Sequence, residues 1–486
     1  MATSRALSKS AAIRARLSHP VIDSDGHTAE FEPALFDYLR NVAGARVVER
    51  LKSLSNSPLS FRWYRMTPQE RRDQRLARPL WAAHPTRNTL DRATSSLPKL
   101  LHERLPEMGI DFTIIYPSFG MVLPNLGDEE LRRASCRALN QLHADIFRAY
   151  SDRVTPVAVI PMHTPAEAAE ELDHAVKVLG FKAILMPSFV VRPVPAVARR
   201  IPEAARHVHW FDTFALDSEY DYDPVWAKCL ELKVVPSFHS GTMGLGMRNS
   251  ISNFIYNHIG HFAASAEAVC KALFLGGVTR RFPDLRFTFL EGGAGWASSL
   301  LCDLAGHWEK HNVEMVTNYD PDALDQDLMR RLFREYGGDY GADVAAREED
   351  RSQLLWGAPQ DPADLDEFAR CAITRKEDIR DQFVPKFFFG CEGDDRMTAV
   401  AFEPRKNPFG ARLGAIYGSD LGHFDLPNMR DAVAEAWEMV EHGCIGEKDF
   451  RDFVFVNPVR AKAEVNHDFF KGTVVENAAR ALMGGE

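Results

Sequence analysis

Eight short apolar runs follow one another along the chain, and each is closed by residues capable of chemistry or by a proline or glycine turn. They lie at residues 21–23, 111–116, 154–160, 181–186, 233–238, 286–290, 387–389 and 415–417. Their apolar character is continuous rather than alternating, which is typical of parallel strands covered on both faces. A chain with this pattern is expected to build an α/β fold around a parallel sheet.

Helix-start signals lie between these runs. The segment Thr164-Pro165-Ala166-Glu167 combines an N-cap hydroxyl, a proline at the first helical position and a glutamate three residues after the cap, and the predicted helix runs to Gly180. Asp128 precedes a second helical pattern, and Asp223 followed by proline opens a third. Strands and helices therefore alternate, and eight such units predict a (β/α)8 TIM barrel with long loop insertions.

The chain of 486 residues would by length alone suggest two or three domains, but a barrel with long loops can absorb that many residues in one unit. Long connections at about 40–105, 190–225 and 305–385 are expected to be insertions, of the kind that often caps an active site. We therefore expect a single barrel domain over residues 20–486. A flexible arm is expected at residues 1–19, although its basic, acid-free composition is also typical of a transit peptide.

Charge and cysteine content exclude several classes of protein. The net charge of −10 and the pI near 6.0 argue against a nucleic-acid surface, which needs clustered lysine and arginine. The 7 cysteines include no Cys-x-x-Cys pair, which disfavours a disulfide framework and a thiolate zinc site. No run approaches the roughly 18 apolar residues of a membrane span. A cytoplasmic enzyme of small-molecule chemistry is the expectation.

Side chains able to bind metal stand at the ends of three runs. The first run leads into Asp25-Gly26-His27, and alternate residues of a strand share a face, so Asp25 and His27 can point at one ion. His239 follows the fifth run and Asp420 follows the eighth. The carboxyl ends of barrel strands meet at one rim, so these four side chains are expected to converge. Two imidazoles and two carboxylates suit zinc, manganese or iron better than calcium or magnesium.

These segments resemble the amidohydrolase superfamily, and within it the amidohydrolase-related branch that includes aminocarboxymuconate semialdehyde decarboxylase and the aromatic acid decarboxylases. The resemblance covers most of residues 20–480. It is carried by Asp-Ser-Asp-Gly-His at 23–27, Ser-Phe-His-Ser-Gly at 237–241, Phe-Leu-Glu-Gly-Gly at 289–293 and Tyr-Gly-Ser-Asp-Leu-Gly-His at 417–423. The resemblance implies a metal-dependent barrel in which Asp420 binds the metal and also moves a proton. It also implies a homo-oligomer.

Two positions depart from the family pattern. Typical members open with His-x-His or Glu-x-His, whereas Asp25 stands first here, and Glu291 replaces the histidine that members commonly carry after the sixth strand. Asp25, Glu291 and Asp420 would crowd carboxylates into one mouth, and like charges at close range either raise a pKa or bind cations. His258 and His261 offer two further imidazoles, so a second metal ion held with Glu291 is an alternative. Further candidates for the carboxylate cluster are Glu30 and Glu392.

Three functional hypotheses follow. The first is a hydrolase or decarboxylase, the latter a carbon–carbon lyase, that acts on a small organic acid with one divalent ion, in which Asp420 relays the proton and Glu291 orients water or substrate. Aromatic residues in the long connections, such as Trp63 and Trp81, favour an aromatic acid as substrate. The second hypothesis is a dinuclear non-haem iron or manganese oxygenase on the same barrel. The third is a catalytically silent barrel that serves as a partner subunit and binds no metal tightly.

The usual signatures of other enzyme classes are missing from the sequence. It contains no Gly-x-Ser-x-Gly elbow, no phosphate-binding loop and no well-placed dinucleotide fingerprint. Metal-assisted chemistry at the barrel rim is therefore the sequence-based prediction.

Overall fold

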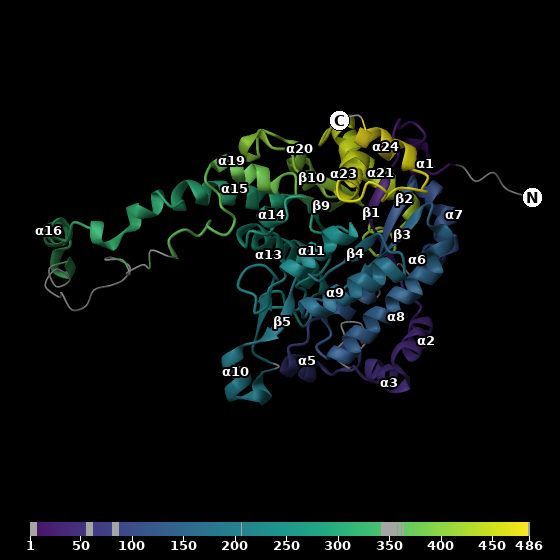
Figure 1. Cartoon of the computed structure of the whole chain (residues 1–486), viewed down its shortest axis with the longest axis horizontal. Helices are drawn as coiled ribbons and strands as arrows, with labels where there is room; N and C mark the ends of the chain where they lie inside the picture. Colours follow the sequence, from purple (N-terminus) through teal and green to yellow (C-terminus); the bar gives the residue numbers. More distant parts are fainter. Residues whose placement is uncertain are drawn as a thin grey trace, which may run out of the picture.

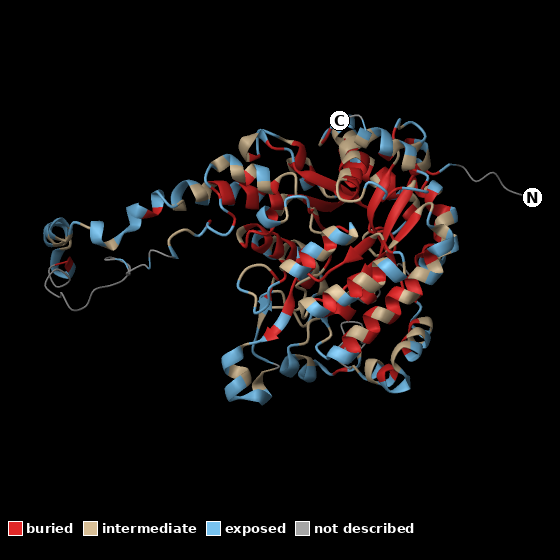
Figure 2. Ribbon diagram, in the orientation of Figure 1, coloured by how far each residue is buried: buried red, intermediate tan, exposed pale blue. Residues whose placement is uncertain are grey.

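The computed structural model describes residues 7–54, 62–79, 87–205, 207–341, 357, 361 and 364–484. Figure 1 shows a central barrel covered by helices, from which the segment around α16 (Gln326–Tyr336) projects to one side. Strands and the inward faces of the helices form the buried core in Figure 2. Trp81 and parts of the predicted insertions at 40–105 and 305–385 lie outside the described residues.

Two runs of parallel strands form the barrel. The first run pairs in the order β1 (Ile22–Thr28), β2 (Phe112–Pro117), β3 (Val154–Val159) and β4 (Ala183–Leu185). The second contains β7 (Ser237–Phe238), β8 (Phe287–Phe289), β9 (Phe387–Glu392) and β10 (Gly414–Gly418). Each of the predicted apolar runs overlaps one of these strands.

Backbone contacts join the two runs at both edges. Met186, just after β4, bridges to Phe238 of β7 in parallel orientation. At the other edge the N–H of Asp420 donates to the carbonyl of Asp25 at 2.9 Å, and the N–H of His27 donates to the carbonyl of Leu421 at 2.8 Å. The eight parallel strands of the described chain therefore close into a barrel, and the predicted (β/α)8 fold is confirmed.

β1 is longer than the sequence predicted. It continues past residue 23 to Thr28 because it pairs with β2 as far as Pro117, with a register irregularity between Asp23 and Gly26. All of its residues are buried. Asp25 and His27 therefore lie within the strand, two residues apart, as the sequence pattern predicts.

The helices that cover the barrel begin where the sequence signals lie. Thr164 caps α9 with both hydrogen bonds of a capping box, and Asp128 caps α8. The helices of the described chain include α2 (Glu32–Ala43), α7 (Pro98–Met108), α8 (Glu129–Phe147), α9 (Pro165–Asp173), α11 (Asp223–Leu232), α13 (His261–Leu275), α15 (Gly295–His311), α19 (Lys376–Phe383), α21 (Ala432–Glu441) and α24 (Glu476–Gly484). They also include α3 (Ala45–Ser53), α4 (Arg62–Arg65), α5 (Pro68–Gln74), α6 (Thr89–Ser96), α10 (Pro195–Arg200), α12 (Phe254–His258), α14 (Val278–Arg281), α20 (Ala399–Phe402), α22 (Glu447–Arg451) and α23 (Asn457–Ala463).

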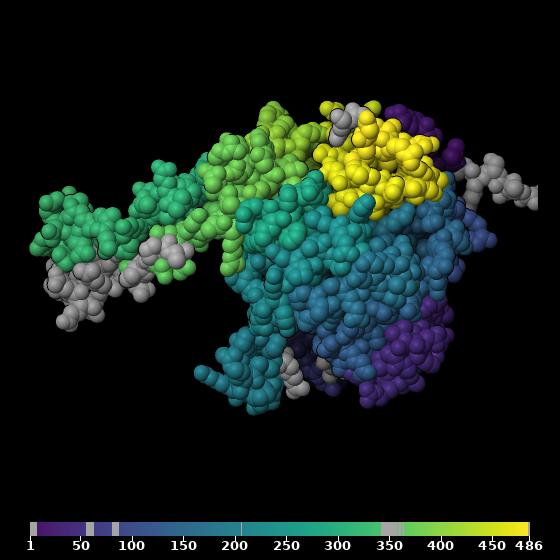
Figure 3. All heavy atoms as spheres, in the orientation of Figure 1, coloured from purple at the N-terminus to yellow at the C-terminus, as the bar shows by residue number. Residues whose placement is uncertain are grey.

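Two features were not predicted from the sequence. The insertion at 190–225 contains an antiparallel hairpin of β5 (Val190–Pro193) and β6 (His209–Asp212). Within the expected flexible arm, residues 9–14 form helix α1 (Lys9–Arg14), which packs beside the C-terminal helices (Figure 3). This part of the chain is packed and not flexible, because Ser10 and Ile13 are buried and Ser10 Oγ accepts a hydrogen bond from the N–H of Ala434. In the described part of the chain, no helix combines the length and the apolar character needed to cross a membrane.

Replacing Ile13 with alanine tests the docking of α1. Its side chain is 2% exposed, so the cavity left by Ile13→Ala should lower the free energy of unfolding by about 2 kcal/mol, measured by urea denaturation. Leu7→Ala is the matched control because Leu7 is 77% exposed. Equal stabilities of the two variants would contradict the packed helix.

Candidate metal centre

Asp25, His27, His239 and Asp420 meet at one end of the barrel, although β1, β7 and β10 bring them from distant parts of the sequence. His27 Nε2 lies 3.5 Å from Asp25 Oδ1, 3.3 Å from Asp420 Oδ1 and 3.2 Å from His239 Nε2. His239 Nε2 lies 3.4 Å from Asp25 Oδ1. Ligand atoms around one tetrahedral ion are about 3.4 Å apart when each is 2.1 Å from the metal. Asp25, His27 and His239 therefore have the spacing that a shared ion requires, and Asp420 adjoins them through His27.

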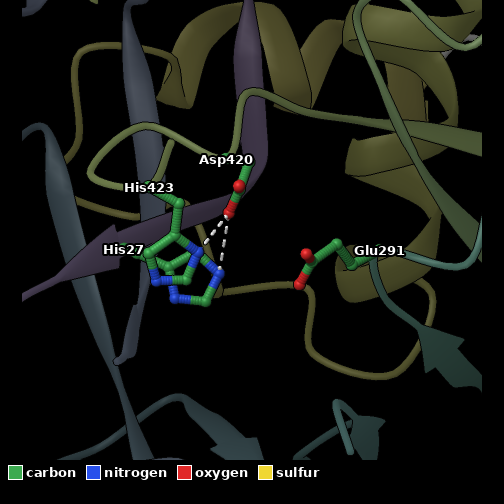
Figure 4. Close-up of side chains that lie close together, drawn as sticks. All are labelled: His27, Glu291, Asp420 and His423. Carbon is green, nitrogen blue, oxygen red and sulfur yellow. Dashed lines mark ion pairs between the residues drawn. The ribbon is translucent and has the colours of Figure 1, made fainter. Parts of the chain in front are cut away.

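Glu291 and His423 lie beside His27 and Asp420, and Figure 4 shows these four side chains pointing toward one another. Glu291 Oε2 lies 3.4 Å from His239 Nε2. His423 Nδ1 lies 2.8 Å from Asp420 Oδ1, and its ring stacks on that of His27 with centroids 3.9 Å apart. His423, which ends the sequence motif at 417–423, was not among the predicted site residues; it faces Asp420 through a turn in which its N–H donates to the carbonyl of Asp420.

The cluster suits a cation because it contains buried oxygens that the described residues do not satisfy. Asp25 Oδ1 and Glu291 Oε2 are buried and have no hydrogen-bond partner among the described residues. A buried polar atom left without a partner costs about 1–3 kcal/mol, and more if it is charged. A divalent ion at this position would offset that cost, so the residues fit the metal that the sequence predicts.

Burial and mutual repulsion raise the pKa values of two carboxyl groups of the centre. Burial, with the charges of Asp425 and Asp25, raises the pKa of Asp420 well above its usual range. Burial, followed by the charges of Asp420 and Glu392, raises the pKa of Glu291 well above its usual range. Positive charge is thus needed if both groups are to be ionised together.

Both of these carboxylate residues have strained backbones. Glu291, just after β8, has φ 56°, and Asp420, just after β10, has φ 48°. The left-handed region costs a residue other than glycine about 1–3 kcal/mol, and such residues cluster at active sites. The strain is therefore a second, independent pointer to function at these two positions.

Asp23 supports the centre from below. Its carboxylate accepts hydrogen bonds from Thr113 Oγ1 at 2.8 Å, from Ser419 Oγ at 2.8 Å, and from the N–H groups of Ser419 at 2.9 Å and Asp25 at 3.2 Å. These bonds connect β1 and β2 to the end of β10. Asp23 thereby fixes the residues next to Asp420 against the strand that carries Asp25.

A second group of carboxylates adjoins the first. Ligand atoms of Glu392, Asp420 and Asp425 lie within 4.8 Å of one another. A cavity of about 230 Å³ beside them is lined by residues that include His258, His261, Glu291, Glu392 and Asp425. Of the additional residues predicted from the sequence, Glu392 joins the carboxylates, whereas His258 and His261 line the cavity wall without entering the clusters of potential ligands found in the described chain.

Glu30 has a different role from the one expected. Its carboxylate accepts hydrogen bonds from the N–H groups of Phe119 at 2.8 Å and Gly120 at 3.2 Å, and so holds the turn after β2. Glu30 does not belong to the potential metal-binding clusters among the described residues. It is a structural residue of the barrel wall.

The first long connection lies against the loop that follows β7. The N–H of Arg78 donates to the carbonyl of Ser250 at 2.9 Å, and Asn257 Nδ2 donates to the carbonyl of Arg78 at 3.1 Å. Asn249 Nδ2 donates to the carbonyl of Arg75 at 2.7 Å. Two segments far apart in the sequence thus form one cover near His258 and His261.

Part of this chain is similar to a known protein family. The family model described as Amidohydrolase matches residues 116–340. Over these residues the chain is similar to the amidohydrolase family. The match includes β7 with His239 and the turn that carries Glu291, so the resemblance predicted from the sequence is confirmed.

Solved structures resemble this barrel at low sequence identity. An amidohydrolase from Mycobacterium avium subsp. paratuberculosis K-10 is 16% identical, with 92% of this chain and 99% of that chain covered and a TM-score of 0.50. A 2,6-dihydroxybenzoate decarboxylase from Rhizobium is 15% identical, with 91% and 98% covered and a TM-score of 0.47. A dihydroxybenzoic acid decarboxylase from Polaromonas sp. JS666, solved with bound manganese, is 15% identical, with 93% and 97% covered and a TM-score of 0.45. The first of these similarities supports the barrel fold and leaves the reaction open.

Replacement of Asp23 tests its supporting role. Asp23→Ala removes the acceptor of two buried N–H groups and two hydroxyls, and each unpaired buried donor costs about 1–3 kcal/mol. We expect a clear loss of thermal stability, measured by calorimetry. An unchanged melting temperature would contradict the assigned role.

Proposed function

We propose that this protein is a metal-dependent enzyme that decarboxylates or hydrolyses a small organic acid. The observation that carries the proposal is the set of 3.2–3.5 Å separations among Asp25 Oδ1, His27 Nε2 and His239 Nε2, with Asp420 Oδ1 3.3 Å from His27 Nε2. These residues would hold one zinc, manganese or iron ion, because mixed nitrogen and oxygen ligands suit those metals. When bound, the ion would polarise a substrate carboxylate or carbonyl, or lower the pKa of a water molecule.

Asp420 is the proposed proton-transfer residue. Its Oδ1 lies 2.8 Å from His423 Nδ1, and His423 Nε2 lies 2.9 Å from Ser118 Oγ. Each of these groups can accept and release a proton, so the three form a path along which a proton can reach or leave Asp420. In decarboxylation Asp420 would protonate the carbon that loses carbon dioxide, and in hydrolysis it would accept a proton from water. Glu291 would orient the substrate or the water.

Aromatic side chains around the centre favour an aromatic acid as substrate. The ring of Phe262 lies 5.0 Å from that of His239, and the ring of Tyr116 lies 5.6 Å from it. Phe424 lies 5.2 Å from His258 at the neighbouring cavity. Such rings can stack against a planar substrate. The sequence resemblance to the aromatic acid decarboxylases supports the same substrate class.

A dinuclear oxygenase is the second candidate, and one observation favours it. Asp420 belongs both to the group with His27 and to the group with Glu392 and Asp425, so it could bridge two ions.

The family resemblance also supports a proposed homo-oligomeric assembly, which sedimentation velocity can test.

Substitution of single ligands tests the proposed centre. Asp420→Asn and His239→Ala should each lower kcat by about 10²-fold or more against the substrate found by screening aromatic acids, while circular dichroism stays native. His311→Ala is the control because His311 is partly exposed and lies near the end of α15, outside the clusters of potential metal ligands found in the described chain. Full activity in either site variant would remove the proposed mechanism.

Metal counting separates the candidate functions. Elemental analysis of anaerobically purified protein should give about one divalent ion per chain, and chelation should abolish an activity that proceeds without oxygen. Two ions per chain together with oxygen consumption would favour the oxygenase. Absence of both tight metal binding and turnover would indicate a silent partner subunit.

A further inference from the structure

Lys462 lies in the interior of the barrel. It belongs to α23, which is attached to β10 through a hydrogen bond from Asn457 Nδ2 to the carbonyl of Ala415, and Figure 1 shows the helix against that strand. The residue is 3% exposed. Its Nζ lies 3.0 Å from Ser237 Oγ and 3.5 Å from Thr288 Oγ1, and these two hydroxyls lie 2.8 Å apart. The ammonium group therefore sits between β7 and β8.

This position is directly beneath the candidate metal centre. Ser237 and His239 are two residues apart, so their side chains share the inward face of the chain at β7. His239 reaches the rim, whereas Ser237 lies one layer below and contacts Lys462. The lysine thus approaches the site from the barrel floor, on the side away from the substrate mouth.

The two hydroxyls do not neutralise the ammonium charge. In the described part of the chain, the polar contacts of Lys462 are Ser237 and Thr288, and no carboxylate lies within ion-pair distance. Burial lowers the pKa of Lys462 to about 7, and the charge of Asp25 acts in the opposite direction. A buried charge of this kind is costly, and an apolar side chain would fill the same space without that cost. An anionic partner at longer range is therefore needed.

The anionic partner that the structure offers is the centre itself. The charge of Asp25 on β1 acts on the lysine, and the titratable groups beside this layer in the described chain include Tyr116 of β2, which interacts with Ser237, and Asp23 of β1. We propose that Lys462 is the built-in counter-ion of the metal centre, which offsets the charge of Asp25 when no metal ion is bound. The inference depends on the proposed metal centre. Because a divalent ion and the ammonium then compete for the same negative charge, metal binding favours loss of the lysine proton to solvent.

The direct test is the manganese affinity of the metal-free protein at two pH values, measured by calorimetry. Lys462→Met removes the charge but keeps most of the side-chain volume. With a lysine pKa of about 7, linkage of one proton predicts that the variant binds manganese about tenfold more tightly than wild type at pH 6 and within about twofold at pH 8. Lys182→Met is the matched control, because Lys182 is half-buried and donates to the backbone carbonyls of Phe469 and Lys471. The control should match wild type at both pH values.

A second variant covers the case in which Lys462→Met does not fold. Thr288→Val keeps the lysine but removes one acceptor of the ammonium, so its manganese affinity at pH 6 should rise in the same direction by a smaller factor. Folded variants whose affinities equal or fall below that of wild type at both pH values would overturn the counter-ion and leave the metal centre standing. Wild-type protein that binds no manganese would overturn both.

Discussion

The contact between β10 and β1 is the interaction on which the whole site depends. The N–H of Asp420 donates to the carbonyl of Asp25, and the carboxylate of Asp23 accepts from Ser419 on the other side of the same seam. This seam brings the last strand of the barrel to the first, across almost four hundred residues of sequence. Without it, Asp420 would have no fixed position relative to Asp25 and His27.

Closure of the barrel holds several buried carboxyl groups close together, and their mutual repulsion must be offset. Asp25, Glu291 and Asp420 are drawn together in a buried region, and the pKa values of Glu291 and Asp420 rise because their ionised forms are disfavoured there. The Nε2 atoms of His27 and His239 lie 3.2 Å apart in the same region. A divalent ion relieves both the repulsion and the unsatisfied oxygens, and a buried lysine below the centre can do so in part when the ion is absent. Glu291 and Asp420 have left-handed backbone conformations, so the fold tolerates a local free-energy cost that positions their carboxyl groups.

Much of this arrangement could be predicted from the sequence because barrel strands carry their chemistry at one end. That rule predicts Asp25, His27, His239 and Asp420 at one rim; the structure groups the first three and places Asp420 against His27. The rule fails for residues that reach the centre by other routes. His423 depends on a turn around a left-handed Asp420, and Asp425 depends on the path of the loop beyond it. Lys462 reaches the barrel interior from α23, which follows the last predicted strand, and the β5–β6 hairpin depends on cross-strand pairing within an insertion.

The most direct test of the account is the position of a bound ion. Crystals grown with manganese and measured near the manganese absorption edge should show one anomalous peak within about 2.3 Å of Asp25, His27, His239 and Asp420. A fully occupied peak at another location, with these four side chains unliganded, would contradict the central claim.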